Sequence, residues 1–351
     1  MIVRIIQVGM GGWGRNWTRY VVSRNTDVEL VACVDPVPAM QELSQKEITL
    51  PANRYFTSLS EALARVDCDA VLITTSLEGH VPSALTALAA GKHVLLEKPF
   101  APTIEEAQQV VAAAQQQNRV LMISQNYRFF PAVQAVRELV RQGMLGPLGN
   151  VSIDFRRYAN TAPKENHKHY TLWQPLLVDM SIHHFDLMRY IFGQEASQIF
   201  CQTWNPPWSN FATAPAATAA ITFDGGTIVN YQGSWVSPGP QTSWSGEWRM
   251  EFARGEVIWE SRGDTPDHVT LHLLGEQPQA LALPEVPLTD RHGSLHAFVQ
   301  AIRTGQEPES SGRDNLQTLA LMLAAVKSAT DGSLIKLQGS DRKSQKLDRI
   351  N

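Results

Sequence analysis

A glycine-rich turn near the start of the chain constrains the fold more than any other segment. The apolar run IVRIIQV leads into Gly9-Met10-Gly11-Gly12-Trp13-Gly14, and a helical stretch follows from Gly14 to Arg24. This is the GxGxxG pattern between a strand and a helix, which is typical of a dinucleotide-binding βαβ unit. Gly9 would allow the tight turn, Gly11 would let a pyrophosphate approach the backbone, and Gly14 would let the helix pack closely on the strand. Gly12 and Trp13 belong to the same predicted cofactor site.

An acidic residue supports this interpretation. Asp35 ends the next apolar run, VELVACVD, about 20 residues after the last glycine. A carboxylate at this place can bind both ribose hydroxyls and would repel a 2′-phosphate, so the sequence favours NAD, with NADP possible if a cation from elsewhere meets that phosphate. The alternative is a structural glycine turn in which Asp35 caps the next helix.

Strand-like and helical stretches alternate through the first third of the chain. Apolar runs of this kind suit strands buried on both faces, and their alternation with helices predicts a parallel sheet. We therefore expect an α/β Rossmann domain, with a doubly wound parallel sheet, over residues 1–125. Hairpin signals at Asp224-Gly225-Gly226 and Arg254-Gly255-Glu256 predict a C-terminal α+β domain with a large, mostly antiparallel sheet over residues 126–338. Residues 339–351 are expected to be a polar tail.

Composition narrows the class of protein. Of 351 residues, 43% are apolar and 18% are charged, and the formal net charge is −4. These values are typical of a globular protein, and they argue against nucleic acid or an anionic membrane as a partner. Cys33, Cys68 and Cys201 form no CxxC or disulfide pattern, which fits a reducing compartment. With no recognisable leader or membrane span in the sequence, we expect a cytoplasmic protein.

Polar clusters follow two of the predicted strands. Open parallel sheets bind ligands at the carboxyl ends of their strands, so both clusters are expected to face the cofactor. They consist of Thr74, Thr75 and Ser76 after one strand and of Glu97, Lys98 and Pro99 after the next. For Lys98 the ordinary alternative is a surface lysine. After the last strand of this domain, Asn126 is expected at the cofactor, and Tyr127 and Arg128 toward the substrate.

A second candidate cluster lies in the segment from Val178 to Phe192, which we expect to be one helix. Asp179 and His183 are four residues apart and should share one helical face. Taken alone, this pattern also fits a helix cap at Asp179 and a core histidine at His183. His184 lies about 100° further round the helix and should turn toward the core. The histidines of this region lack the ligand spacing of a metal site, and no metal is expected.

Together these segments resemble the glucose–fructose oxidoreductase, inositol dehydrogenase and MocA (Gfo/Idh/MocA) family over nearly the whole chain. The similarity rests on GMGGWG, the strand end at Asp35, ITTSLEGH, GKHVLLEKP, QNYRFFP and DMSIHHFDLMRYIFG, and EKP followed by DxxxH is its most specific element. The resemblance implies an NAD(P)-dependent dehydrogenase acting on CH–OH groups. It implies that Lys98, Asp179 and His183 are catalytic and contact the substrate, and it adds His80 to the cofactor site.

The chain departs from the family just before Asp179. A glycine pair often stands there, whereas this sequence has Gln174 and Pro175. This departure concerns the substrate-binding turn more than the chemistry. The polar loop 158–172, with Tyr170, and Trp173 beyond it would suit a polyhydroxylated ring, and the alternative is a solvated surface loop.

The oxidation of a secondary alcohol fits the candidate groups. A histidine can accept the hydroxyl proton while hydride leaves the same carbon. A nearby ammonium can stabilise the developing alkoxide. A carboxylate can set the imidazole tautomer or bind a neighbouring hydroxyl.

The leading hypothesis is therefore an NAD-dependent oxidoreductase that acts on a sugar or a cyclic polyol. Three alternatives stay open: transient NAD oxidation that drives elimination or glycoside hydrolysis, a non-enzymatic dinucleotide-sensing binding protein, and an oxidoreductase of a non-sugar carbonyl or imine. Retention of Lys98, Asp179 and His183 disfavours the sensor. The resemblance also implies that the C-terminal sheet packs against another subunit, in a homodimer or homotetramer. Aromatic enrichment in that sheet is consistent with this expectation and comes from Trp235, Trp244, Trp248 and Trp259.

Overall fold

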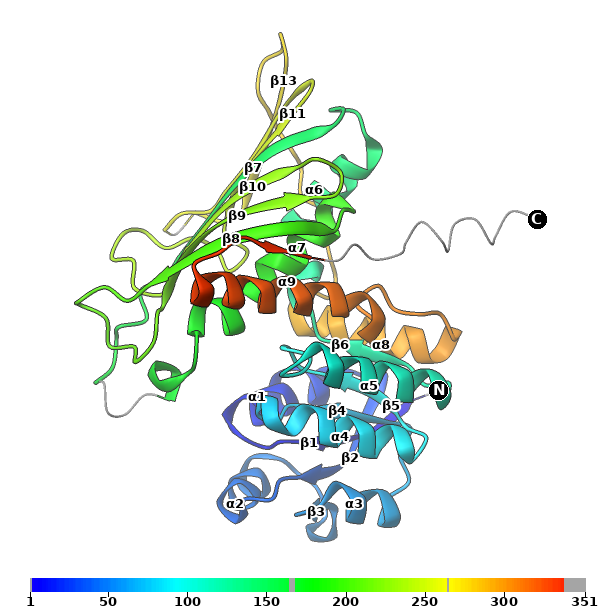
Figure 1. Ribbon diagram of the computed structural model, residues 1–351. Coiled ribbons are helices and arrows are strands. Elements are labelled where there is room, and N and C mark those ends of the chain that lie inside the picture. The colour runs from blue at the N-terminus through cyan, green and yellow to red at the C-terminus, as the bar shows by residue number, and fades with distance from the viewer. Residues whose placement is uncertain (1, 164–167, 264, 338–351) are drawn as a thin grey trace. The chain divides into compact units, whose positions relative to one another are not determined.

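The structure is a computed structural model that describes residues 2–163, 168–263 and 265–337 (Figure 1). The chain forms two compact units. The first unit comprises Met1–Phe129 and Val286–Leu319, and the second comprises Phe130–Glu285 and Ala320–Asn351. The chain first passes from one unit to the other after Phe129, close to the boundary expected near residue 125. It then returns to the first unit at Val286, which the sequence did not reveal. The expected polar tail lies outside the described residues.

The sheet of the first unit confirms the doubly wound parallel fold. In the described residues it has six parallel strands in the order β3-β2-β1-β4-β5-β6, so the direction of winding reverses between β1 and β4. The strands are β1 (Val3–Val8), β2 (Val28–Val34), β3 (Tyr55–Phe56), β4 (Ala70–Ile73), β5 (His93–Leu96) and β6 (Leu121–Ile123). The helices between them are α1 (Gly12–Tyr20), α2 (Pro38–Glu47), α3 (Leu59–Arg65), α4 (Leu77–Ala89) and α5 (Ile104–Gln116).

The returning segment joins the first unit through apolar packing. Helix α8 (Asp290–Thr304) buries Leu295 and Phe298 in the same core as Val3, Ile5 and Trp17. Burying each such side chain contributes about 1.5–3 kcal/mol. Figure 1 shows α8, in orange, beside β6 although the two are far apart in the sequence. Because this core is incomplete without α8, residues 286–319 belong to the dinucleotide half of the chain.

The second unit is built on a nine-stranded sheet. Among the described residues the strand order is β14-β13-β12-β11-β7-β10-β9-β8-β15, and every pairing is antiparallel except that of β7 with β10. This confirms the expected mostly antiparallel sheet. The strands are β7 (Leu148–Arg156), β8 (Ala196–Trp204), β9 (Ala216–Phe223), β10 (Ile228–Ser234), β11 (Glu247–Phe252), β12 (Gly255–Glu260), β13 (His268–Leu273), β14 (Gln279–Ala280) and β15 (Ile335–Lys336).

Helices cover one face of this sheet. Helices α6 (Pro131–Gln142) and α7 (Ile182–Phe192) lie against it in Figure 1. The last helix, α9 (Gly312–Asp331), begins in the residues of the first unit and ends in those of the second. No helix in the described ranges is long and apolar enough to span a lipid bilayer.

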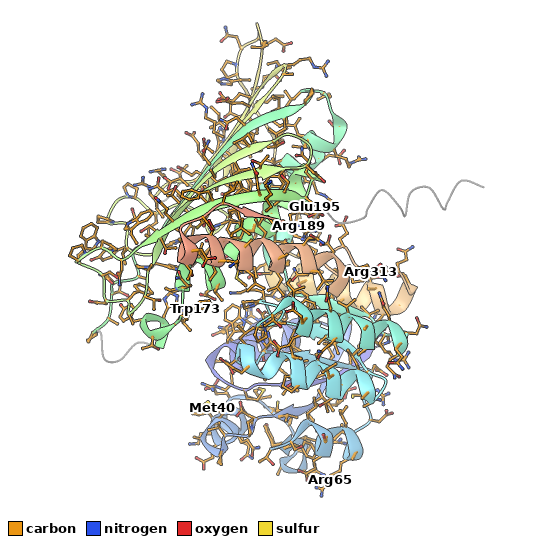
Figure 2. All side chains as sticks on the ribbon, viewed as in Figure 1. Met40, Arg65, Trp173, Arg189, Glu195 and Arg313 are labelled. Atoms are coloured by element: carbon orange, nitrogen blue, oxygen red, sulfur yellow. The ribbon has the colours of Figure 1, made fainter. Side chains whose placement is uncertain are left out.

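A buried ion pair fixes the end of α7. Arg189 Nε and Nη2 lie 2.6 and 2.9 Å from the two carboxylate oxygens of Glu195, and both side chains are buried (Figure 2). Gly193 between them adopts φ +63°, the left-handed conformation that ends many helices. The pair therefore connects the end of α7 to the start of β8.

Three of the four tryptophans that the sequence analysis singled out in the second unit are buried. Trp248 and Trp259 stack on each other with ring centroids 5.7 Å apart, and both are fully buried. Trp235 is buried as well, and of these four only Trp244 is exposed. Trp235, Trp248 and Trp259 therefore pack within the unit and give no support to a subunit interface.

Candidate functional site

The glycine turn has the geometry expected of a dinucleotide site. Gly9 has φ +89°, and a Cβ on Gly14 would lie only 1.8 Å from the Gly9 carbonyl oxygen. Both positions therefore require glycine, one for its conformation and one for the close packing of α1. A Cβ on Gly11 or Gly12 would meet no described atom within 4 Å. The turn thus keeps open space where a pyrophosphate would approach the backbone.

A buried polar network supports this turn from below. Gln7 Nε2 donates to the Gly14 carbonyl at 2.7 Å and to Thr74 Oγ1 at 3.2 Å. Thr74 Oγ1 donates to the Gly9 carbonyl at 2.7 Å, and Thr18 Oγ1 donates to Gln7 Oε1 at 2.7 Å. Thr74 was expected to face the cofactor, and the structure instead buries it as a support of the turn. Its neighbours on the chain, Thr75 and Ser76, are half-buried and exposed.

Asp35 contacts the turn directly. Its Oδ2 accepts a hydrogen bond from the Met10 backbone N–H at 2.7 Å, and its Oδ1 accepts one from the Val37 N–H at 2.9 Å. The carboxylate therefore supports the glycine turn and the bend before α2, but it is not the cap of that helix, whose N-cap residue is Val37. Each carboxylate oxygen can accept a second bond, so binding to ribose hydroxyls is compatible with this geometry.

The Glu97-Lys98-Pro99 segment is held by two buried side chains. Glu97 Oε1 accepts a hydrogen bond of 2.7 Å from Trp17 Nε1, and burial raises the pKa of Glu97 while Lys98 and this hydrogen bond oppose that rise. The His80 ring lies 2.7 Å from the Pro99 carbonyl and 3.2 Å from that of Thr75, and burial lowers its pKa. His80 thus holds the segment that carries Lys98, whose side chain is half-buried.

The residues after β6 differ in their surroundings. Arg128 is buried and donates to the Glu309 carbonyl at 2.9 Å and to Asp314 Oδ2 at 2.8 Å. It anchors the returning segment, which differs from the substrate contact expected of it. Asn126 donates through Nδ2 to Asp290 Oδ1, and Tyr127 is half-buried.

In the second unit, the helix that carries the catalytic candidates begins earlier than expected and is not uniform. Pro175–Ser181 is a π-helix, and α7 continues from Ile182. The five residues from Asp179 to His183 therefore cross from one helix type to the other, and the assumed α-helical spacing does not describe them. Gln174, which replaces a glycine of the family pattern, has φ +46°. The sequence change is thus accommodated in a backbone conformation that glycine adopts more readily.

The carboxylate of Asp179 has a histidine neighbour that was not among the site residues expected from the sequence. Asp179 Oδ2 lies 3.5 Å from His169 Nε2, and the Asp179 side chain is 39% exposed. The His169 ring packs edge-on against Trp235 and Phe211 at centroid distances of 4.9 and 5.1 Å. His183 is buried, with 5% of its surface exposed. His169 was visible in the sequence only as part of a polar loop, whose residues 164–167 lie outside the described ranges.

Two aromatic residues expected at the substrate have different surroundings. Tyr170 is fully buried, and its hydroxyl donates to the Ala159 carbonyl at 2.7 Å and accepts from the Ala162 N–H at 3.2 Å. Tyr170 therefore closes the loop onto itself. Trp173 is 60% exposed and is labelled in Figure 2.

His184 lies in the core, as the helical geometry predicted. Its Nδ1 is 2.9 Å from the Tyr231 hydroxyl, and its Nε2 is 2.9 Å from the Trp244 carbonyl. Because a carbonyl only accepts, Nε2 carries the proton and Nδ1 accepts from Tyr231. Burial lowers the pKa of His184 to about 4 and keeps the ring neutral. Within the described ranges, no group of three or more His, Cys, Asp or Glu side chains is arranged to hold a metal ion.

Comparison with known proteins places both halves of the chain in one family. A family model described as an oxidoreductase family with an NAD-binding Rossmann fold matches residues 3–125. A second, described as the GFO/IDH/MocA C-terminal domain, matches residues 133–256.

Individual relatives match over most of their length. The chain is 26% identical to inositol 2-dehydrogenase of Rhizobium meliloti, over 96% of this chain and 100% of that protein. It is 25% identical to 1,5-anhydro-D-fructose reductase of Ensifer adhaerens, over 80% of this chain and 84% of that protein. The crystal structure of the WlbA dehydrogenase from Bordetella pertussis, in complex with NADH and UDP-GlcNAcA, has the same fold, with a TM-score of 0.80 at 21% identity over 97% of this chain and 100% of that one.

Alanine substitutions at two glycines of the turn should have different effects. Gly14→Ala places a methyl group on the Gly9 carbonyl and should lower the free energy of unfolding by about 1–3 kcal/mol or more. Gly11→Ala meets no atom of the protein, so it should unfold like the wild type and yet bind NAD more weakly. Thermal unfolding and NAD titration of both variants test this, with Gly149→Ala of the second unit as the control. Unchanged NAD affinity in Gly11→Ala would contradict the assignment.

The acid sensitivity of folding should depend on His184. The folded ring stays neutral down to a pKa of about 4, whereas the unfolded ring takes up a proton near the ordinary histidine pKa of 6.5. Stability contributed by neutral His184 is therefore present above that unfolded value and is lost as the pH falls toward 4. The free energy of unfolding, measured in urea, should fall between pH 7 and pH 5 in the wild type. In His184→Gln this fall should be smaller by on the order of 1–2 kcal/mol. The exposed His268→Gln should behave like the wild type, and equal losses in all three proteins would rule out the assignment.

Proposed function

Because this chain belongs to the Gfo/Idh/MocA family of NAD-binding oxidoreductases, we propose that it oxidises or reduces a hydroxyl-bearing carbon of a sugar or cyclic polyol. The observation that carries the proposal is the open glycine turn in the first unit, together with Lys98 at the end of β5. The resemblance to the family also supports roles for Asp179 and for the buried His183, which belong to the second unit. The names of relatives such as inositol 2-dehydrogenase and 1,5-anhydro-D-fructose reductase support a polyhydroxylated substrate.

The proposed reaction assigns a separate role to each side chain. When bound, NAD supplies the acceptor for the hydride that leaves the hydroxyl carbon. His183 accepts the hydroxyl proton, so the carbon–oxygen bond becomes a carbonyl. The Lys98 ammonium donates a hydrogen bond to the same oxygen and stabilises its developing negative charge. Asp179 and His169, 3.5 Å apart, offer a carboxylate and an imidazole to a neighbouring hydroxyl group.

Cofactor choice follows from Asp35. Its carboxylate stands at the end of β2, bound to the Met10 and Val37 backbone amides. A negative charge fixed at this place favours a ribose diol and disfavours a 2′-phosphate, which supports NAD over NADP.

The proposal is tested by a dehydrogenase screen of polyols and aldoses with NAD and with NADP. Lys98→Met should lower turnover about 10²-fold, as loss of one well-placed electrostatic group does. His183→Ala should abolish most of the activity, and the wild-type rate should rise with pH because a protonated imidazole cannot accept a proton. Control variants are Lys46→Met and His268→Gln, whose side chains are exposed and should leave the rates unchanged.

Two outcomes of the screen would count against the proposal. An unchanged rate and pH profile in His183→Ala would remove the histidine from its role as base. A wild type that binds NAD but forms no net NADH with any substrate would favour a member that uses transient oxidation for elimination or glycoside hydrolysis, or a dinucleotide sensor.

We further propose that two or four copies of the chain associate through the outer face of the nine-stranded sheet. On this face β10 exposes Asn230 and Gln232 beside Ile228, and β7 exposes Ser152. Light scattering at micromolar concentration should report a dimer or tetramer, and Gln232→Arg should weaken it while Arg65→Met, on the first unit, does not. A monomeric wild type would overturn this proposal.

A further inference from the structure

The segment that returns to the first unit, Val286–Leu319, contains an arginine that was not among the site residues expected from the sequence. Asp290 and Arg291 are the first two residues of α8. Asp290 has φ +54°, an unusual value for a residue other than glycine. The same helix buries Leu295 and Phe298 in the core that also holds Trp17 of α1. The position of Arg291 relative to the glycine turn is therefore set by a shared core within one unit.

Arg291 packs on the aromatic residues of α1. Its guanidinium carbon lies 4.4 Å from the centroid of the Trp13 ring and 5.5 Å from that of Trp17. Trp13 directly follows Gly11 and Gly12, where the turn keeps open space. Trp17 donates to Glu97, the residue before Lys98. The guanidinium thus packs on one residue that directly follows the glycine turn and on another that is hydrogen-bonded to the end of β5.

The guanidinium has unused donors in this position. The Arg291 side chain is only 12% exposed, and neither Nε nor Nη1 has a hydrogen-bond partner among the described residues. The carboxylate of Asp290 is 3.7 Å from Nε, an ion-pair distance too long for a hydrogen bond, and its other oxygen accepts from Asn126. A buried donor without an acceptor is unfavourable, so an acceptor that reaches these atoms gains from them.

We propose that Arg291 binds the pyrophosphate of the dinucleotide. This inference rests on the proposed function, because it concerns the cofactor of the same reaction. A guanidinium is a planar cation whose paired N–H donors match phosphate oxygens. The N-terminal N–H groups of α1, next to Trp13, attract the same anion. The aromatic rings hold the guanidinium in place before the ligand binds, so little conformational entropy is lost on binding.

Two other groups could accept hydrogen bonds from Arg291. One is the carboxamide of the nicotinamide, which is neutral, and the other is a carboxylate of the substrate, which is not part of the cofactor. The pyrophosphate is favoured because it carries negative charge and because the open space at Gly11 and Gly12 adjoins Trp13, on which Arg291 packs.

Calorimetric titration with NAD, ADP-ribose and AMP distinguishes these partners. ADP-ribose keeps the pyrophosphate and lacks the nicotinamide, and AMP lacks the pyrophosphate. Arg291→Met should bind NAD and ADP-ribose about 10- to 100-fold more weakly, with a much smaller change for AMP. Arg291→Lys, which keeps the charge and loses the planar fork, should fall between Met and wild type. Arg65→Met removes an exposed cation of the same unit and should leave all three affinities unchanged.

The outcomes separate the inference from the proposed function. Unchanged ADP-ribose affinity in a folded Arg291→Met, as judged by its thermal unfolding, would overturn the inference and leave Arg291 as packing for the two tryptophans. A loss confined to NAD would also overturn it and would point to the nicotinamide. If Arg291→Met does not fold, Arg291→Lys decides, because full affinity for ADP-ribose in that variant contradicts recognition through the planar fork. A wild type that binds neither NAD nor ADP-ribose would instead overturn the proposed function.

Discussion

The close approach of α1 to the turn that precedes it is the constraint on which the first unit depends. The Gly9 carbonyl oxygen occupies the space where any side chain at Gly14 would stand. This approach buries polar groups, and Gln7 and Thr74 satisfy them with hydrogen bonds inside the core. The start of α1 is thereby fixed above the parallel strands at the point where their winding reverses. An anion-binding helix end and an open turn follow from one contact between two backbone segments.

Local patterns in the sequence were sufficient to predict the helices and strands, but not all of the tertiary contacts that they make. The glycine turn, the strands of the parallel sheet and the hairpin at Asp224-Gly225-Gly226 were predictable because each depends on neighbouring residues. The return of α8 was not, because an apolar helical face does not specify which of two cores it enters. Arg128 and Tyr170 were expected to contact substrate for the same reason. Sequence reveals a polar side chain, whereas its partner, such as Asp314 for Arg128, lies far along the chain.

The adjacent histidines of α7 show how the surroundings of a buried side chain determine its protonation and its possible role. His184 is bonded to a tyrosine hydroxyl and a backbone carbonyl, and burial keeps it neutral. His183, one residue earlier, follows the π-helical stretch that carries Asp179. A π-helical turn widens the backbone locally and is frequent at functional sites. The chain enters this stretch through Gln174 in a left-handed conformation, so a position where the family often has glycine keeps glycine-like geometry with a different side chain.

The division of the first unit between two stretches of chain has a consequence for its synthesis. A ribosome releases residues 1–129 first, and the 156 residues from Phe130 to Glu285 must emerge before α8 does. During that interval Val3, Ile5 and Trp17 lack the apolar surface of Leu295 and Phe298 that covers them in the finished protein. Domains usually fold as they leave the ribosome, in order from the N-terminus. Here the first unit to be started can be completed only after strands β7 to β14 of the second have been translated, so a nascent chain carries an unfinished dinucleotide domain for most of its elongation.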